Sequence, residues 1–232
     1  MKILGFIETS FLDWEGKLSS VIFVGGCNFN CPFCQNYPLV KQSKKLKEFQ
    51  WQDISKRLTA KKHWIDGVVI SGGEPMMHPE IFELLANIKQ LGLATKIDTN
   101  GFYPYPLKSA IEHHLVDYVA MDIKTTLDKK YDIACGRKIF LEVIERTIKL
   151  LKESGVDYEF RTTLVPTIVC PDDLIVISEK LAPVKRYALQ QFVPANARLM
   201  RFRKLKPYTK KDIELVLPTL KKYCDEVILR GF

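Results

Sequence analysis

Three of the six cysteines lie in one short segment, Cys27-Asn-Phe-Asn-Cys31-Pro-Phe-Cys34. Thiolates hold iron-sulfur clusters, and a 4Fe-4S cluster held only by protein takes four of them. The next cysteine, Cys135, is remote in sequence. The segment therefore predicts a 4Fe-4S cluster with one iron left open, much as a catalytic zinc keeps one position for water or substrate. A structural zinc site is the competing interpretation, but the nearest histidine, His63, has no partner at zinc-finger spacing.

S-adenosylmethionine suits such an open iron, because its methionine amine and carboxylate can chelate a metal and bring the sulfonium beside the cluster. One electron from the cluster could then break a carbon-sulfur bond. With Phe33 directly before the third cysteine, the segment resembles the CxxxCx-aromatic-C signature of the radical S-adenosylmethionine (radical SAM) superfamily. The resemblance implies that Phe33 packs near the adenine of the cofactor. Anchoring the loop by hydrophobic contact is the alternative role for Phe33.

The composition of the 232-residue chain predicts a single domain spanning residues 1–232, because 47% hydrophobic residues can fill one sizeable core. Its 35 basic and 27 acidic side chains give a formal charge of +8, which favours an acidic partner, a nucleotide or a nucleic acid. Much of the excess lies in residues 41–47, where a solvated loop is favoured, and in residues 198–211. The second run interleaves Phe202 and Tyr208 with basic residues, so a binding surface and a solvated face both stay open.

The start of the chain shows no evident signal peptide, and no run reaches the ~20 apolar residues that span a bilayer. We therefore expect a cytoplasmic protein without membrane contact. A reducing compartment keeps thiols available for iron, and it fits Cys135, Cys170 and Cys224 as buried, unpaired structural thiols.

Apolar runs alternate with amphipathic ones along the chain, a pattern typical of a parallel sheet with crossover helices. The expected fold is α/β, an open partial (β/α)6 TIM-like barrel of mostly parallel strands, because six units fall short of the eight that close a full barrel. The closing EVILRGF segment adds a terminal strand or covers an edge. The predicted strands are Ser20–Val24, Gly67–Ser71, Ala94–Asp98, Tyr118–Asp122, Asp157–Val165 and Tyr187–Phe192. The predicted helices are Trp51–Lys62, Pro79–Leu91, Leu107–His114, Phe140–Ser154, Pro171–Leu181 and Lys210–Tyr223.

Four polar motifs each follow one of the first four predicted strands. They are the cysteine segment, Gly72-Gly73-Glu74-Pro75, Asp98-Thr99-Asn100-Gly101 and Met121-Asp122-Ile123-Lys124. Right-handed crossovers place the loops after parallel strands on one face, so these motifs predict one site. Glycine lets the backbone approach a ligand closely. Two carboxylates in one mouth repel each other unless a cation or a positive ligand lies between them.

The same motifs carry a resemblance to radical SAM activating enzymes. It implies that Gly72, Gly73 and Glu74 form the GGE motif that binds the methionine amine. As in the activating enzyme of pyruvate formate-lyase, Asp98, Thr99 and Asp122 would face a monovalent cation, and Lys124 would reach the carboxylate or ribose of S-adenosylmethionine. Asn100 joins the predicted cofactor-binding residues. Arg161 is a further candidate, as a fork for a carboxylate or as half of a structural ion pair.

Over nearly the whole chain the sequence resembles the anaerobic ribonucleoside-triphosphate reductase activating proteins. The segments that carry this are ETSFLDWEGKLSSVIFVGGCNFNCPFCQNYPLV, SGGEP, KIDTNGFYP and LVDYVAMDIKTTLDKKY. Glu15 departs from the family, which usually has proline there. The resemblance implies an enzyme that cleaves S-adenosylmethionine to a 5′-deoxyadenosyl radical and removes hydrogen from a glycine Cα of its partner reductase. It also implies a flavodoxin or ferredoxin-type electron donor.

Other functions stay open at this point. The same radical could act on a small molecule such as a pterin or deazaguanine precursor, on RNA, or on a different glycyl-radical enzyme. The sequence has no second cysteine cluster and no recognisable nucleic-acid module, which argues against a small molecule or RNA as substrate. Nucleic acid is therefore not the favoured partner. A closed four-cysteine cluster would better serve a simple electron carrier.

Overall fold

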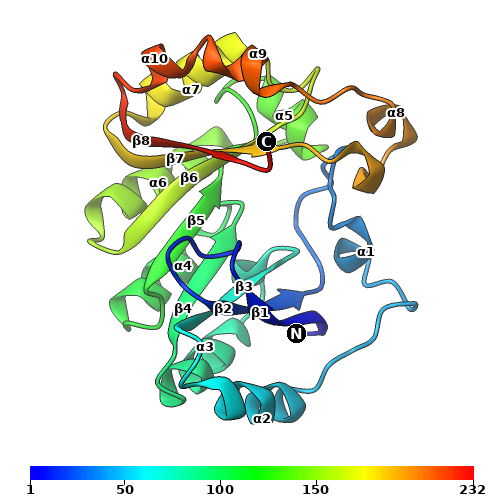
Figure 1. The fold of residues 1–232 in the computed structure, drawn as a ribbon, viewed down its shortest axis with the longest axis vertical. Coiled ribbons are helices and arrows are strands. Elements are labelled where there is room, and N and C mark those ends of the chain that lie inside the picture. Colours follow the sequence, from blue (N-terminus) through cyan, green and yellow to red (C-terminus); the bar gives the residue numbers. More distant parts are fainter. The chain divides into compact units, whose positions relative to one another are not determined.

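The computed structural model describes residues 1–232, which form an α/β fold with eight strands hydrogen-bonded in sequence order (Figure 1). Residue contacts divide the chain into two compact units. Unit 1 contains residues 1–28, 36–120 and 153–157, and unit 2 contains residues 29–35, 121–152 and 158–232. The chain passes between the units repeatedly, and not through one linker, so a single domain remains our interpretation.

Unit 1 has a parallel core with an antiparallel edge. β2 pairs in parallel with β3, and β3 with β4, whereas β1 pairs antiparallel with β2. The strands β2 and β3 read SSVIFV and GVVISG and are largely buried, as expected where a parallel sheet is covered on both faces. The elements of this unit are β1 (Ile3–Ser10), β2 (Ser19–Val24), α1 (Tyr37–Val40), α2 (Trp51–Lys61), β3 (Gly67–Gly72), η1 (Pro75–Met77), α3 (Ile81–Gln90), β4 (Ala94–Thr99), α4 (Pro104–Glu112) and the first part of β5 (Tyr118–Asp122).

Unit 2 repeats the parallel pattern, with β6 paired to β7 and β7 to β8. The closing EVILRGF segment lies largely in β8, so the terminal strand is confirmed. The elements of this unit are α5 (Lys130–Cys135), α6 (Leu141–Glu153), β6 (Asp157–Leu164), α7 (Pro171–Leu181), β7 (Val184–Gln191), η2 (Pro194–Asn196), α8 (Met200–Arg203), α9 (Lys210–Glu214), α10 (Leu217–Leu220) and β8 (Cys224–Arg230). The last residue of α6, Glu153, and the first residue of β6, Asp157, are assigned to unit 1.

The predicted strands and helices are confirmed with small shifts at their ends, apart from two expectations that were wrong and one strand that was not predicted. The helix expected over residues 210–223 is two short helices, because Pro218 cannot donate a backbone hydrogen bond and opens the second one. The strand β1 was not predicted. Cys170, expected to be buried, is exposed at the start of α7, whereas Cys135 and Cys224 are buried as expected. No helix combines the length and the apolar character needed to cross a bilayer.

The segment between β1 and β2 inserts Trp14 into the hydrophobic core of unit 1, and we call this insertion the plug. Trp14 is only 4% exposed and its ring lies 5.8 Å from that of Tyr118, in a cluster with Val21, Val69 and Ala120. The ammonium of the buried Lys96 donates to the backbone carbonyl of Asp13 at 2.5 Å. Glu15, the residue that departs from the family pattern, is exposed, so its substitution leaves this packing intact.

We expect Trp14→Ala to lower the free energy of unfolding by about 3–5 kcal/mol, because it removes a buried indole and leaves a cavity. Trp64→Ala is the matched control, since Trp64 is 79% exposed, and it should change stability by less than about 0.5 kcal/mol. Urea unfolding of both variants measures the difference. Equal stability of the two would contradict the plug.

Candidate active site

Gly72, the last residue of β3, and Gly73 directly after it allow the chain to lie against the backbone at the end of β2. The Gly73 amide donates to the Val24 carbonyl and the Glu74 amide to the Gly26 carbonyl, both at 2.9 Å. A Cβ at Gly73 would lie 1.6 Å from the Gly26 oxygen. Gly72 has φ +113°, which a side chain would disfavour. Part of the expected close approach is therefore to the chain's own backbone, at the start of the cysteine loop.

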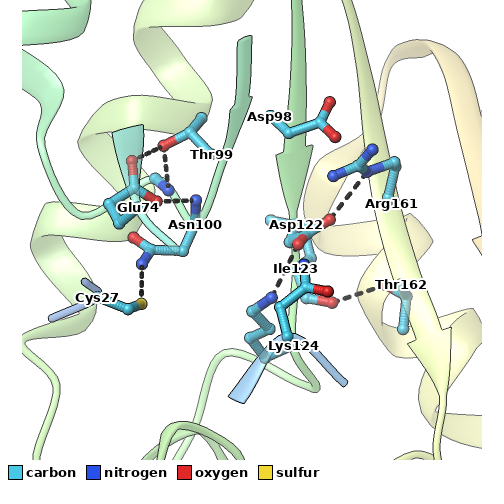
Figure 2. Close-up of polar contacts among 12 residues, drawn as sticks. Cys27, Glu74, Asp98, Thr99, Asn100, Asp122, Ile123, Lys124, Arg161 and Thr162 are labelled. Atoms are coloured by element: carbon cyan, nitrogen blue, oxygen red, sulfur yellow. Dashed lines mark hydrogen bonds and ion pairs between the residues drawn. The ribbon is translucent and has the colours of Figure 1, made fainter. Parts of the chain in front are cut away.

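The carboxylate of Glu74 joins the loops after β3 and β4. Glu74 is fully buried, and its Oε1 accepts hydrogen bonds from the Thr99 hydroxyl at 2.7 Å and the Met76 amide at 3.1 Å. Its Oε2 accepts from the Asn100 amide at 2.7 Å (Figure 2). A buried carboxylate is tolerated when such donors replace water. These contacts make Glu74 a support for the site, whatever else the GGE motif contacts.

Asn100 extends the connection to the cysteine loop. Its side-chain amide donates to Asn28 Oδ1 at 2.8 Å and approaches Cys27 Sγ at 3.8 Å (Figure 2). Its Oδ1 accepts from the Phe102 amide at 3.0 Å, which fixes the orientation of the side chain. An amide donor beside a thiolate stabilises negative charge on sulfur. In unit 1, the GGE segment, the DTNG segment and Cys27 thus form one connected group.

Asp98 has partners within unit 1. Its Oδ2 accepts from the Ser71 hydroxyl at 2.9 Å, and its Oδ1 lies 3.9 Å from the Lys96 ammonium. The charge of Asp98 therefore has a cationic neighbour on the same strand. The Lys96 ammonium can balance the charge of Asp98 without a bound metal cation. A monovalent cation held by Asp98, Thr99 and Asp122 stays a prediction.

In unit 2, Asp122 lies between two cationic side chains. Its Oδ1 accepts from Arg161 Nε at 2.9 Å and its Oδ2 from Lys124 Nζ at 2.8 Å (Figure 2). Burial opposes ionisation of Asp122, but Arg161 and Lys124 outweigh it and lower the pKa of Asp122 to about 2. Burial likewise opposes the charge of Lys124, while Asp122 raises the Lys124 pKa. Of the two roles expected for Arg161, the structure shows the ion pair.

Backbone contacts hold this triad in register. The Ile123 amide donates to the Arg161 carbonyl at 2.7 Å, and the Thr162 hydroxyl donates to the Ile123 carbonyl at 2.8 Å (Figure 2). The pairing places Arg161, in the middle of β6, beside Asp122, the last residue of β5. Two cations against one carboxylate leave net positive charge, which suits an anionic group such as a carboxylate.

The second and third cysteines of the loop lie in unit 2, and their surroundings suit iron ligands. The Cys34 amide donates to the Cys31 carbonyl at 3.2 Å. A hydrogen bond from Cys135 lowers the pKa of Cys31 against the effect of burial, and Lys124 acts in the same direction. Burial raises the pKa of Cys135. Thiolates are the form that binds iron, so Cys31 fits a cluster, and Cys135 is a neighbour that sequence spacing had not connected to it.

Phe33 is 6% exposed and its ring lies 6.3 Å from that of Phe202. This contact supports the loop-anchoring role, and the adenine contact stays a prediction. Cys27 belongs to unit 1, whereas Cys31 and Cys34 belong to unit 2. No group of three His, Cys, Asp or Glu side chains is already gathered around a metal position. None of the six cysteines forms a disulfide, so the donor chemistry fits a 4Fe-4S cluster, while the complete ligand set rests on the spacing of the cysteines.

Comparison with known proteins identifies the family of this chain. The profile of the Radical SAM superfamily matches residues 21–171. A candidate glycyl-radical enzyme activating enzyme of Methanocaldococcus jannaschii is 32% identical over 234 residues, covering 98% of this chain and 95% of that protein. The pyruvate formate-lyase-activating enzyme of Clostridium pasteurianum is 26% identical over 223 residues, covering 91% and 92%.

Shorter and more distant similarities accompany these two. The 7-carboxy-7-deazaguanine synthase of Synechocystis is 32% identical over only 91 residues, or 39% of this chain and 42% of the synthase. The crystal structure of methylornithine synthase superposes with a TM-score of 0.66 at 17% identity, over 87% of this chain. The chain spans 62% of that longer protein. This likeness confirms the expected fold, an open partial TIM-like barrel.

The depressed pKa of Asp122 predicts a defined dependence of stability on pH. Its folded-state value of about 2 lies below the ordinary value of 3.8, so the ionised triad stabilises the fold fully above about pH 4, and this contribution is lost as pH falls toward 2. We expect wild type to be more stable than Asp122→Asn at neutral pH, with the difference shrinking below about pH 4. Urea unfolding of both proteins across this range measures it. A difference that stays constant down to pH 2 would contradict an ionised Asp122.

Proposed function

The chain belongs to the radical SAM superfamily, and from this premise we propose that it activates a glycyl-radical protein, with an anaerobic ribonucleoside-triphosphate reductase as its partner. It is an enzyme that uses a 4Fe-4S cluster and S-adenosylmethionine. The observation that carries the proposal is the match to the Methanocaldococcus jannaschii protein over 98% of this chain and 95% of that protein. The match to the deazaguanine synthase of Synechocystis covers only 39% of this chain. A small-molecule substrate is therefore the weaker alternative.

Cys27, Cys31 and Cys34 would hold the cluster. When bound, the cluster and S-adenosylmethionine supply the electron and the 5′-deoxyadenosyl radical that removes hydrogen from a glycine Cα of the partner. Around them, Glu74 and Asn100 hold two loops and the start of the cysteine segment in place. Gly72 and Gly73 let this segment pack on the chain's own backbone, and by the resemblance to the GGE motif the segment would also meet the methionine amine.

Lys124 and Arg161 would present positive charge to the methionine carboxylate, with Asp122 orienting both cations. The ion pair with Asp122 raises the pKa of Lys124, so this side chain stays charged across the physiological pH range, and an arginine is always charged there. A fixed pair of cations fits an anionic group without a proton transfer. This role for unit 2 is consistent with a chemistry that moves a hydrogen atom, because such a step needs no general acid or base.

The proposed partners are proteins. An activating enzyme needs an electron donor, and a flavodoxin or ferredoxin-type protein fits that requirement. We place the protein in the cytoplasm, where the reductase and reducing conditions would coincide. The net charge of +8 favours partners with acidic surfaces.

Electron paramagnetic resonance tests the proposal. The protein is reconstituted anaerobically with iron and sulfide, reduced, and mixed with S-adenosylmethionine and the anaerobic ribonucleotide reductase of the same organism. We expect a glycyl-radical doublet on the reductase. Cys27→Ala, Cys31→Ala and Cys34→Ala should abolish both the doublet and the release of methionine, while Cys224→Ala, which alters a buried thiol on β8, should retain both.

Methionine release without a glycyl radical would reject the reductase as substrate and leave the cofactor chemistry in place. The same assay with a pyruvate formate-lyase and with a deazaguanine precursor would then separate another glycyl-radical enzyme from a small-molecule substrate. Full methionine release by any of the three cluster variants would contradict the assigned ligands.

A further inference from the structure

The segment 29–35, which carries Cys31 and Cys34, belongs to unit 2, although its neighbours on both sides in the chain belong to unit 1. It contains no helix or strand. Fixing the backbone of a segment costs conformational entropy, and residues 29–35 have no helical or sheet hydrogen bonds of their own to offset it. Contacts from elsewhere in unit 2 must therefore hold it, and the structure shows two sets of them.

The first set comes from the end of α5. The Asn30 amide donates to the Cys135 carbonyl at 2.8 Å. Gly136 follows with φ +66°, and a Cβ there would lie 2.2 Å from the Asn30 carbonyl oxygen. Glycine is thus required both by the backbone conformation and by the approach of the loop. These contacts locate the residue directly before Cys31.

The second set comes from residues 198–202, which we call the strap. Arg198 Nη1 donates to the Asn30 carbonyl at 2.6 Å and also to Asn30 Oδ1. The Leu199 amide donates to the Pro32 carbonyl at 3.0 Å. The ring of Phe202, which is 4% exposed, packs against Phe33. The strap therefore contacts the loop at three points along residues 30–33, on both sides of Cys31 in the chain.

The Asn30 residue is where both sets meet. Its amide is held by α5, and its carbonyl and side-chain oxygen are held by Arg198. Hydrogen bonds from a charged donor are stronger than those between neutral groups. Arg198 is 168 residues from Asn30 in sequence, and it belongs to the basic run whose purpose the sequence left open. At least one cation of that run therefore makes a structural contact within unit 2.

We propose that Arg198 is a positioning residue for the cluster loop, holding Cys31 and Cys34 where they keep the iron-sulfur cluster bound. The proposal rests on the cluster assignment made under the proposed function, but not on the partner. A cluster with three protein ligands has few contacts to lose. Greater mobility of the loop that supplies Cys31 and Cys34 should therefore accelerate release of the cluster. Arg198 touches neither iron nor substrate in this role.

The test compares Arg198→Ala, Arg198→Lys and Lys204→Ala. Lys204 is an exposed cation at the end of α8, so its loss matches the charge change without touching the loop. The reconstituted proteins are mixed anaerobically with excess iron chelator, and the decay of the visible absorption of the cluster is followed. We expect decay roughly tenfold faster in Arg198→Ala, since charge-assisted hydrogen bonds are lost, an intermediate rate in Arg198→Lys, and the wild-type rate in Lys204→Ala.

Amide hydrogen exchange of the cluster-free proteins provides a second readout that needs no cofactor. Peptides covering residues 28–35 should exchange faster in Arg198→Ala than in wild type and Lys204→Ala. Equal cluster decay in Arg198→Ala and Lys204→Ala would overturn the proposal, whether or not the exchange differs. Neither readout uses S-adenosylmethionine or the reductase, so failure to form a glycyl radical leaves this result independent.

Discussion

The arrangement of the unit 1 loops depends on the hydrogen bonds that the buried carboxylate of Glu74 accepts. A carboxylate removed from water is costly unless donors surround it. Glu74 receives hydrogen bonds from the Thr99 hydroxyl and from the amides of Met76 and Asn100. These donors come from its own turn and from the loop after β4. Satisfying one charge therefore sets the relation between two loops, and Asn100 carries that relation to Cys27.

In unit 2 a buried carboxylate is likewise stabilised, but by cationic side chains and not by neutral donors. Asp122 balances two cations, and the excess positive charge remains for a ligand. The cysteine loop is held there by the hydrogen bond from Arg198 to Asn30 and by the tilted contact between the rings of Phe33 and Phe202. In each unit a charged or polar group at a strand end is fixed by neighbours before any cofactor arrives. Such preorganisation is what a reactive radical site requires, because the protein must orient its cofactor and exclude side reactions.

Local patterns predicted much of the fold and of the candidate site. Apolar runs located the parallel strands, and the cysteine spacing, the paired glycines and the DTNG segment marked the loops that follow them. What was missed depends on contacts distant in sequence. Neither Arg198 beside Asn30 nor Cys135 beside Cys31 leaves a local signal. The edge strand β1 pairs antiparallel and half-exposed, which weakens its apolar pattern. The break between α9 and α10 lies just before Leu217, and Pro218 in the first turn of α10 was visible in the sequence.

Electron-nuclear double resonance of the reduced, reconstituted protein tests the central claim most directly, namely that three cysteines leave one iron open for S-adenosylmethionine. The cofactor is labelled with ¹⁵N in its methionine amine. We predict a ¹⁵N hyperfine coupling to the cluster, which gives way to the ¹⁴N pattern when unlabelled cofactor is used. A fully reduced 4Fe-4S cluster that shows no coupling to the labelled nitrogen at saturating cofactor would contradict an open iron.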